Sequence, residues 1–116
     1  MVNHGWYRAN SLRRTQAVGL KKPNAWGLYD MYGNAFEWCQ DGYGEYPSEP
    51  VIDPVGAASL ERRIVRGGAY ISRPEHVYSG LRGDVARDFR RATGLRVCRT
   101  RVGDRSVQND GDSADQ

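Results

Sequence analysis

Two carboxylates and the backbone between them could bind a metal ion. Asp30 and Glu37 fall within a span of eight residues, and Gly33 and Ala35 lie between them. Carboxylate and carbonyl oxygens suit a hard cation such as Ca²⁺. The alternative is structural: Glu37 and its neighbour Asp41 pair with arginines of later strands, which an arginine-rich, loop-rich chain also needs.

The other residue types that could carry chemistry are isolated in the sequence. His4 and His76 could act as general acid or base, but neither has an adjacent nucleophile or a second ligand, so a surface-loop histidine is the simpler interpretation. Cys39 and Cys98 show no C-x-x-C spacing. They are expected as two free thiols, with a single disulfide between them as the alternative.

The elements that must position these residues are short and separated by turns. One helical turn is predicted over 28–32 and a strand over 36–40. Residues 42–58 are dense in glycine and proline, which predicts a surface loop.

The second half of the chain carries the strongest strand signal. Residues 62–71 are rich in β-formers, with Gly67-Gly68 as an expected bulge or close approach. A short helix is predicted over 85–91 and a closing strand over 94–100, with Leu95 and Val97 facing the core. Residues 103–116 are polar and acidic, which predicts a disordered tail.

Length and charge exclude several classes of function. A chain of 116 residues holds one domain at most, and its net charge of +3 includes no basic run of the kind that binds nucleic acid. No apolar segment approaches the roughly 20 residues of a membrane span. The first residues lack the apolar region of a secretory signal, which predicts a cytoplasmic location for the chain as written.

Three sequence blocks together carry a family resemblance. They are Gly-Leu-Tyr-Asp-Met-Tyr-Gly-Asn-Ala-Phe-Glu-Trp at 27–38, Arg-Ile-Val-Arg-Gly-Gly-Ala-Tyr at 63–70 and Gly-Leu-Arg-Val at 94–97. In order and spacing they resemble the motifs of the formylglycine-generating enzyme, or sulfatase-modifying factor, family. The resemblance runs over about 6–101 and covers the C-terminal part of a family domain. Phe36 stands where the family usually has tryptophan.

The resemblance implies a fold and a division of the chain. The expected fold is α+β and C-type-lectin-like, partial and rich in irregular structure. Residues 1–102 would form the C-terminal portion of the domain, followed by the tail at 103–116. The early strands of a family domain would then come from elsewhere, through a separate N-terminal half or through self-association of the chain.

The resemblance also assigns roles to particular positions. It implies a calcium site with side-chain oxygens from Asp30 and Glu37 and backbone carbonyls from Gly33 and Ala35. The two copper-binding cysteines of the family's oxidases correspond to Ser72 and Val77, which cannot bind Cu(I). Copper and oxidase activity are therefore not expected.

A binding function is the reading that remains. Segment 72–91 offers exposed aromatic and basic side chains, and tyrosine and arginine are favoured where partners dock. The predicted ligand-binding residues are His76, Tyr78, Arg82 and Arg87, with an anionic peptide or a partner protein as the ligand. Arg82 could instead brace the Glu37 loop. The alternative function is a component of an oxidoreductase that acts on protein cysteine, completed by the N-terminal half.

Overall fold

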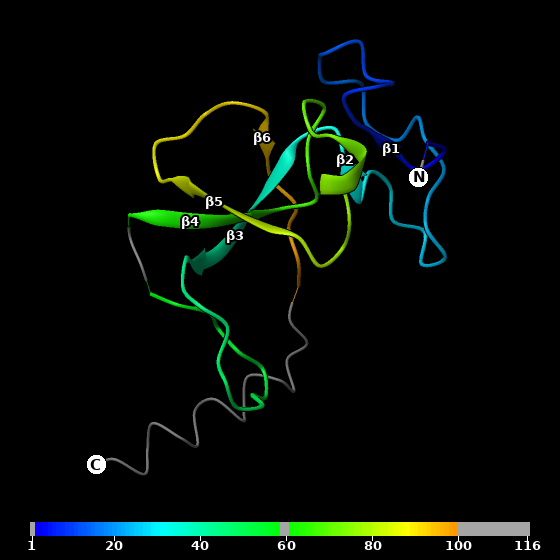
Figure 1. Cartoon of the computed structure of the whole chain (residues 1–116). Coiled ribbons are helices and arrows are strands. Elements are labelled where there is room, and N and C mark those ends of the chain that lie inside the picture. The colour runs from blue at the N-terminus through cyan, green and yellow to red at the C-terminus, as the bar shows by residue number, and fades with distance from the viewer. Residues whose placement is uncertain (1, 59–60, 100–116) are drawn as a thin grey trace, which may run out of the picture.

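The fold is built around a small curled sheet with long irregular connections. A computed structural model describes residues 2–58 and 61–99 (Figure 1). Its strands are β1 (Gly5–Trp6), β2 (Tyr32–Gly33), β3 (Phe36–Gly42), β4 (Arg62–Arg66), β5 (Arg82–Ala86) and β6 (Thr93–Gly94), and a 3₁₀ turn, η1, covers Pro74–His76.

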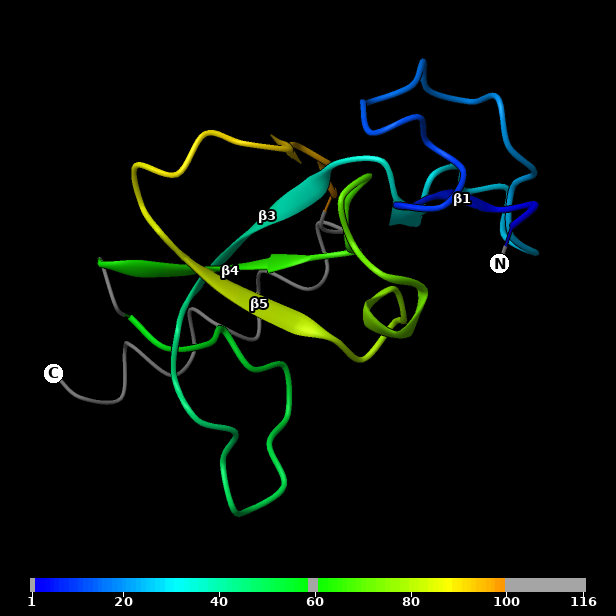
Figure 2. The same ribbon diagram turned by 45° about the horizontal axis from the view of Figure 1, so that its top comes forward.

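The main sheet has the strand order β5-β4-β3-β6. β4 lies at its centre and pairs antiparallel with β3 and with β5, whereas β6 runs parallel to β3. β4 takes the central place because Ile64 and Val65 are β-branched and bury almost completely, on opposite faces of the strand. Figure 2 shows β3, β4 and β5 crossing with the twist expected of a short antiparallel sheet.

A second, two-stranded pair joins the N-terminal segment to the motif at 27–38. β1 and β2 run parallel, with Gly5 opposite Tyr32 and Trp6 opposite Gly33. Gly33 has a φ of 77°, and a Cβ there would overlap the Trp6 carbonyl. Glycine is therefore required at this position both by the backbone conformation and by the close approach of the two strands.

Polar side chains hold the N-terminal segment where few apolar ones are available. The Asn34 side chain accepts a hydrogen bond from the Gln16 amide (2.9 Å) and donates one to the Gln16 carbonyl (3.1 Å), as a neighbouring strand would. Ser11 is fully buried, and its hydroxyl donates to the Tyr70 carbonyl. Buried polar groups that are paired in this way fix the path of the backbone.

The glycine pair ends β4 and lets the chain turn back on the sheet. Gly67 and Gly68 have φ values of 90° and 73°, and a Cβ at Gly68 would lie 3.1 Å from Val77, which is the close approach predicted for the pair. Val77, just after η1, packs against Gly68 and is 3% exposed. Ala69 is also fully buried, so this turn forms a compact centre together with β4.

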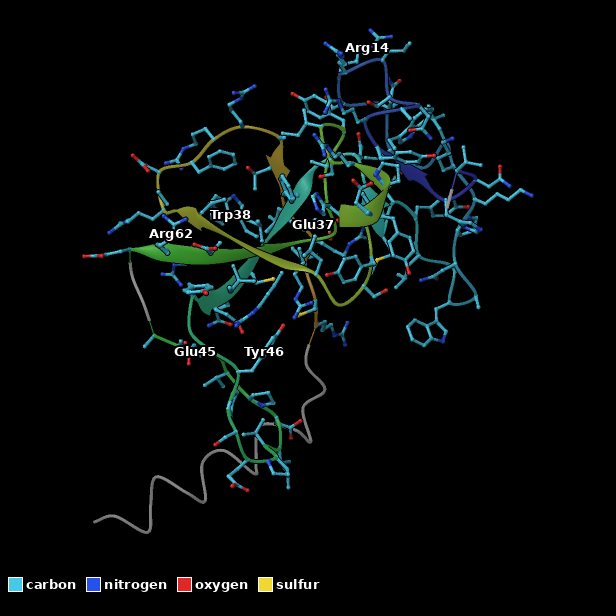
Figure 3. All side chains as sticks on the ribbon, in the orientation of Figure 1. Arg14, Glu37, Trp38, Glu45, Tyr46 and Arg62 are labelled. Carbon is cyan, nitrogen blue, oxygen red and sulfur yellow. The ribbon has the colours of Figure 1, made fainter. Side chains whose placement is uncertain are left out.

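A long loop, residues 43–57, projects from the end of β3 (Figure 1). It closes where Gly42 pairs with Ala57 in an isolated bridge. Its apolar side chains are largely exposed, Ile52 by 93% and Val55 by 76%. Figure 3 shows Glu45 and Tyr46 at the end of the loop that meets the sheet. The surface loop predicted for this region is confirmed.

The two helices predicted from the sequence do not form in the described residues, so the α+β class is met only in its β part. Residues 28–32 form no helical turn and lead into β2, and most of the region predicted as helix around 85–91 is the end of β5 and a turn. Pairing of five β5 residues with β4 overrides the modest helix propensity of the sequence there. The described residues are strands and loops with one 3₁₀ turn.

The closing strand is shorter than predicted. β6 covers only Thr93–Gly94, and Leu95 and Val97 are 77% and 82% exposed instead of facing the core. Arg96 between them is the residue whose side chain reaches back to the sheet and hydrogen-bonds to Glu37. The tail at 103–116 lies outside the described residues, and within those residues no helix is long and apolar enough to cross a bilayer.

The close approach of Gly33 to the Trp6 carbonyl predicts a loss of stability on substitution, and Gly27 provides a matched control. Gly33→Ala should lower the free energy of unfolding by about 1–3 kcal/mol more than Gly27→Ala. Both substitutions strain a backbone with positive φ, but only the Cβ at position 33 would also overlap the Trp6 carbonyl. Gly27 has nearly the same φ, 78°, but nothing lies within 4 Å of a Cβ there. Urea unfolding of both variants measures the difference. Equal losses would contradict the close approach of β1 and β2.

Candidate functional site

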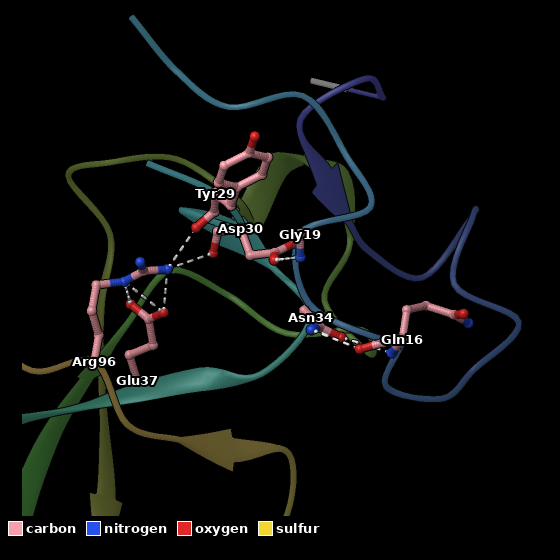
Figure 4. Close-up of polar contacts among 7 residues, drawn as sticks. All are labelled: Gln16, Gly19, Tyr29, Asp30, Asn34, Glu37 and Arg96. Carbon is pink, nitrogen blue, oxygen red and sulfur yellow. Dashed lines mark hydrogen bonds and ion pairs between the residues drawn. The ribbon is translucent and has the colours of Figure 1, made fainter. Parts of the chain in front are cut away.

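Arg96 links the two acidic residues of the predicted metal site, Glu37 through its carboxylate and Asp30 through its backbone carbonyl. Arg96 Nε donates to both carboxylate oxygens of Glu37, at 2.9 and 3.0 Å, and its Nη2 lies 2.8 Å from Glu37 Oε1 (Figure 4). The same Nη2 donates to the carbonyl oxygens of Tyr29 and Asp30. Glu37 therefore pairs with an arginine from the end of the chain, the structural role that the sequence left open.

Asp30 is the most enclosed carboxylate of the motif. It is 9% exposed, and its Oδ2 accepts a hydrogen bond from the Gly19 amide at 2.8 Å. Its Oδ1 is buried and has no hydrogen-bond partner among the described residues. Its φ of 55° lies in the left-handed region, where aspartate is tolerated better than most residues. A buried oxygen without a partner is costly unless something outside the chain satisfies it.

A hollow of about 510 Å³ lies beside this cluster. Asp30, Ala35, Glu37 and Arg96 line it, whereas Gly33 is buried in the β1–β2 pair and does not. Within the described residues no group of three or more acidic, histidine or cysteine side chains is placed to hold a metal ion. Three of the four predicted metal-binding residues thus meet at one hollow, with Arg96 as an additional member.

The predicted ligand-binding residues divide between different surfaces. His76 lines a hollow of about 310 Å³ with Phe36, Val65 and Ser72 on one face of the sheet. Tyr78 is 51% exposed in the turn before β5. Arg87 is exposed directly after β5. It lines neither the hollow beside His76 nor the hollow beside Arg82.

Arg82 lies at a third hollow, against aromatic rings of the projecting loop. Its guanidinium carbon is 3.8 Å from the ring centre of Tyr46 and 5.4 Å from that of Tyr43. The hollow beside it measures about 550 Å³, a size typical of ligand sites. Arg82 does not contact Glu37, so the bracing role considered for it falls to Arg96.

A row of charges crosses the sheet beside this hollow. Glu37 on β3 is opposite Arg66 on β4, which is opposite Arg82 on β5. Arg66 donates one hydrogen bond to the Ser79 carbonyl at 3.1 Å. These side chains share one face because the three residues are in register and side chains alternate along each strand.

Cys39 lies half-buried next to this row, and Cys98 is exposed. Both thiols are free, so the alternative of a disulfide is not realised. Burial raises the pKa of the Cys39 thiol, although the Arg66 guanidinium acts in the opposite direction. The carboxylates of Asp41 and Glu37 add to the rise. A thiol with a raised pKa is a weak nucleophile at neutral pH.

The comparisons with known proteins settle the family. The domain described as "Sulfatase-modifying factor enzyme 1-like domain" matches residues 2–101. The chain belongs to this family. The match confirms the resemblance drawn from the three sequence blocks, and it takes in every strand of this sulfatase-modifying factor-like domain.

Individual relatives match only a part of their own length. The formylglycine-generating enzyme of Bos taurus is 36% identical over 70 residues, 60% of this chain and 19% of that enzyme. Serine/threonine-protein kinase pkn1 of Chlamydia pneumoniae is 46% identical over 62 residues, 50% of this chain and 10% of that kinase. This domain therefore spans between a tenth and a fifth of these two curated relatives.

A solved structure shares the fold. Treponema denticola variable protein 1 aligns with a TM-score of 0.75 and 33% sequence identity, over 81% of this chain and 35% of that chain. The architecture of the described residues is thus that of a part of a formylglycine-generating-enzyme-like domain, made of strands and loops.

Sequence reasoning missed three residues that shape the sites: Arg96, Tyr43 and Tyr46. Arg96 was expected to point away from the core because its neighbours Leu95 and Val97 are apolar. The signal for the tyrosines was weak but present, since two aromatic residues in a loop dense in glycine and proline need a partner surface.

Proposed function

We propose that this sulfatase-modifying factor-like domain is a non-catalytic module that binds a protein or peptide ligand. The scaffold that the resemblance implies, C-type-lectin-like, carries variable loops on a rigid base. Segment 72–91 supplies contacts through His76, Tyr78, Arg82 and Arg87. The exposed tyrosine and the arginines here are residue types that anchor interfaces.

The observation that carries the proposal is the structural role of Ser72 and Val77, the positions that correspond to the copper-binding cysteines of the family's oxidases. Val77 is 3% exposed and packs on Gly68, so it serves the core. The Ser72 hydroxyl accepts a hydrogen bond from the Ala69 amide at 3.0 Å, and its carbonyl accepts one from Arg8. Both positions are occupied by residues that stabilise the turn, and neither offers the soft thiolate that Cu(I) selects.

The oxidoreductase alternative would need a partner to complete it. Leu95 and Val97 are 77% and 82% exposed, next to Arg96, and large exposed apolar side chains favour contact with another segment. A separate N-terminal half or a second copy of the chain is the partner we propose for them. Such a partner would supply strands, but the residues at 72 and 77 would still be serine and valine.

We further propose that Asp30 is the carboxylate of a calcium site. Its buried Oδ1, without a partner in the described chain, fits a hard cation. Glu37 fits less well in this arrangement, because Arg96 holds both of its oxygens. Ca²⁺ and Arg96 should therefore compete for Glu37, and the ion would neutralise the carboxylate that the arginine now pairs with.

The proposal predicts no oxidase activity. Incubation of the chain with Cu(I), oxygen and a cysteine-containing sulfatase peptide should leave the peptide thiol intact by mass spectrometry. A formylglycine-generating enzyme run in parallel shows that the conditions support conversion of the thiol to an aldehyde. Aldehyde formed by this chain would overturn the non-catalytic reading.

The calcium site predicts a stabilisation that depends on Asp30. Ca²⁺ at about ten times its Kd should stabilise the folded chain by roughly 1.4 kcal/mol, because the ion binds only the native state. Asp30→Asn keeps an oxygen for the Gly19 amide but loses the charge, so its melting temperature should not respond. Asp41→Asn is the matched control and should respond as the wild type does. Equal responses of both variants would refute the site.

A further inference from the structure

The guanidinium of Arg82 is held in place but not neutralised. The Tyr46 ring lies 3.8 Å away and the Tyr43 ring 5.4 Å, so two aromatic faces fix its position. No described carboxylate or carbonyl accepts a hydrogen bond from its side chain. A planar cation with five donors, oriented in this way, is prepared to bind a carboxylate with two hydrogen bonds.

The other charges on this face of the sheet leave Arg82 free. Glu37 is engaged by Arg96, and Asp84 is engaged by Arg62. Arg66, next to Arg82 across the strands, makes one hydrogen bond to the Ser79 carbonyl and lines the same hollow. Two arginines, Arg66 and Arg82, therefore line the same hollow of about 550 Å³.

The rest of the lining of this hollow is apolar and acidic. It comes from the end of β3 and from the projecting loop, with Val51, Val55 and Pro54 as apolar lining. Asp41 and Glu45 also line the hollow, and the Asp41 carboxylate packs against the turn at Gly56. Acidic groups on this side disfavour a run of negative charges. The apolar lining favours a ligand that carries an apolar side chain beside its carboxylate.

We propose that the Tyr46–Arg82 hollow is the ligand site of the domain and that it binds a peptide segment through a single acidic side chain. The carboxylate lies on Arg82 and Arg66, and an adjacent apolar side chain lies against the loop. This inference rests on the proposed binding function and names its ligand class. It assigns recognition to residues of the projecting loop that lie outside segment 72–91.

A peptide selection tests the proposal. Random dodecapeptides displayed on phage are selected on the wild-type chain, and the recovered peptides are synthesised with and without their acidic residue. We expect peptides with one aspartate or glutamate beside an apolar residue. Changing that residue to its amide should weaken binding about 10- to 100-fold, as expected for a lost charge-assisted hydrogen bond. Added salt should weaken binding of the acidic form.

Variants locate the contact on the chain. Arg82→Gln and Tyr46→Ala should each lose at least about 10-fold in affinity, whereas Tyr46→Phe, which keeps the ring, should bind as the wild type does. Arg91→Gln, the loss of an exposed arginine outside the hollow, is the charge-matched control. Circular dichroism and melting curves verify that each variant is folded. Of the substitutions at Arg82 and Tyr46, the one at Tyr46 should disturb the fold less, because Tyr46 is 65% exposed.

The outcomes separate this inference from the function on which it rests. Peptides that bind Arg82→Gln and Tyr46→Ala normally but lose binding to a Tyr78→Ala/Arg87→Ala variant would overturn the hollow as the site and leave the binding function standing. Peptides without acidic residues would overturn the ligand class. Failure to recover any binding peptide would overturn the peptide site and leave a folded protein as the ligand of the proposed binding function.

Discussion

The fold depends on a single arginine that joins three distant parts of the chain. Arg96 follows β6, yet its side chain holds the Glu37 carboxylate of β3 and the carbonyls of Tyr29 and Asp30. Only four apolar side chains of the described residues are fully buried, so burial of apolar surface alone does not fix these segments. Paired polar groups do so instead, with Asn34 repeating the pattern on the N-terminal segment (Figure 4).

The Arg96–Glu37 ion pair, which we call the clamp, also decides which charges remain available to a ligand. Because Glu37 is satisfied by Arg96, it does not neutralise Arg66, its neighbour across the strands. The row of charges then ends at Arg82, which is stacked on tyrosine and not paired with a carboxylate. The same interaction that stabilises the fold thus leaves the opposite end of the row positively charged, and the peptide proposal follows from it.

The sequence predicted the parts that local rules determine. The strand at 36–40, the β-rich start of 62–71, the loop at 42–58 and the glycine turn follow from residue type alone. The β5 strand was missed because Arg82–Ala86, with the sequence Arg-Gly-Asp-Val-Ala, carries no strand pattern, and its pairing with β4 decides its conformation. At the end of the chain, alternation predicted an inward Leu95 and Val97. Instead, the Arg96 side chain pairs with Glu37, which lies 59 residues away in sequence, and no periodicity reveals such a contact.

The most direct test of the account is a double-mutant cycle on Glu37 and Arg96. Glu37→Gln, Arg96→Lys and the double variant would be unfolded with urea in EDTA, which removes any contribution of Ca²⁺. A partly buried pair with two charge-assisted hydrogen bonds predicts a coupling energy of about 1–2 kcal/mol. The exposed Arg62–Asp84 pair, taken through Asp84→Asn and Arg62→Lys, should couple by only about 0.2–1 kcal/mol. A Glu37–Arg96 coupling no larger than that of the exposed pair would contradict the clamp.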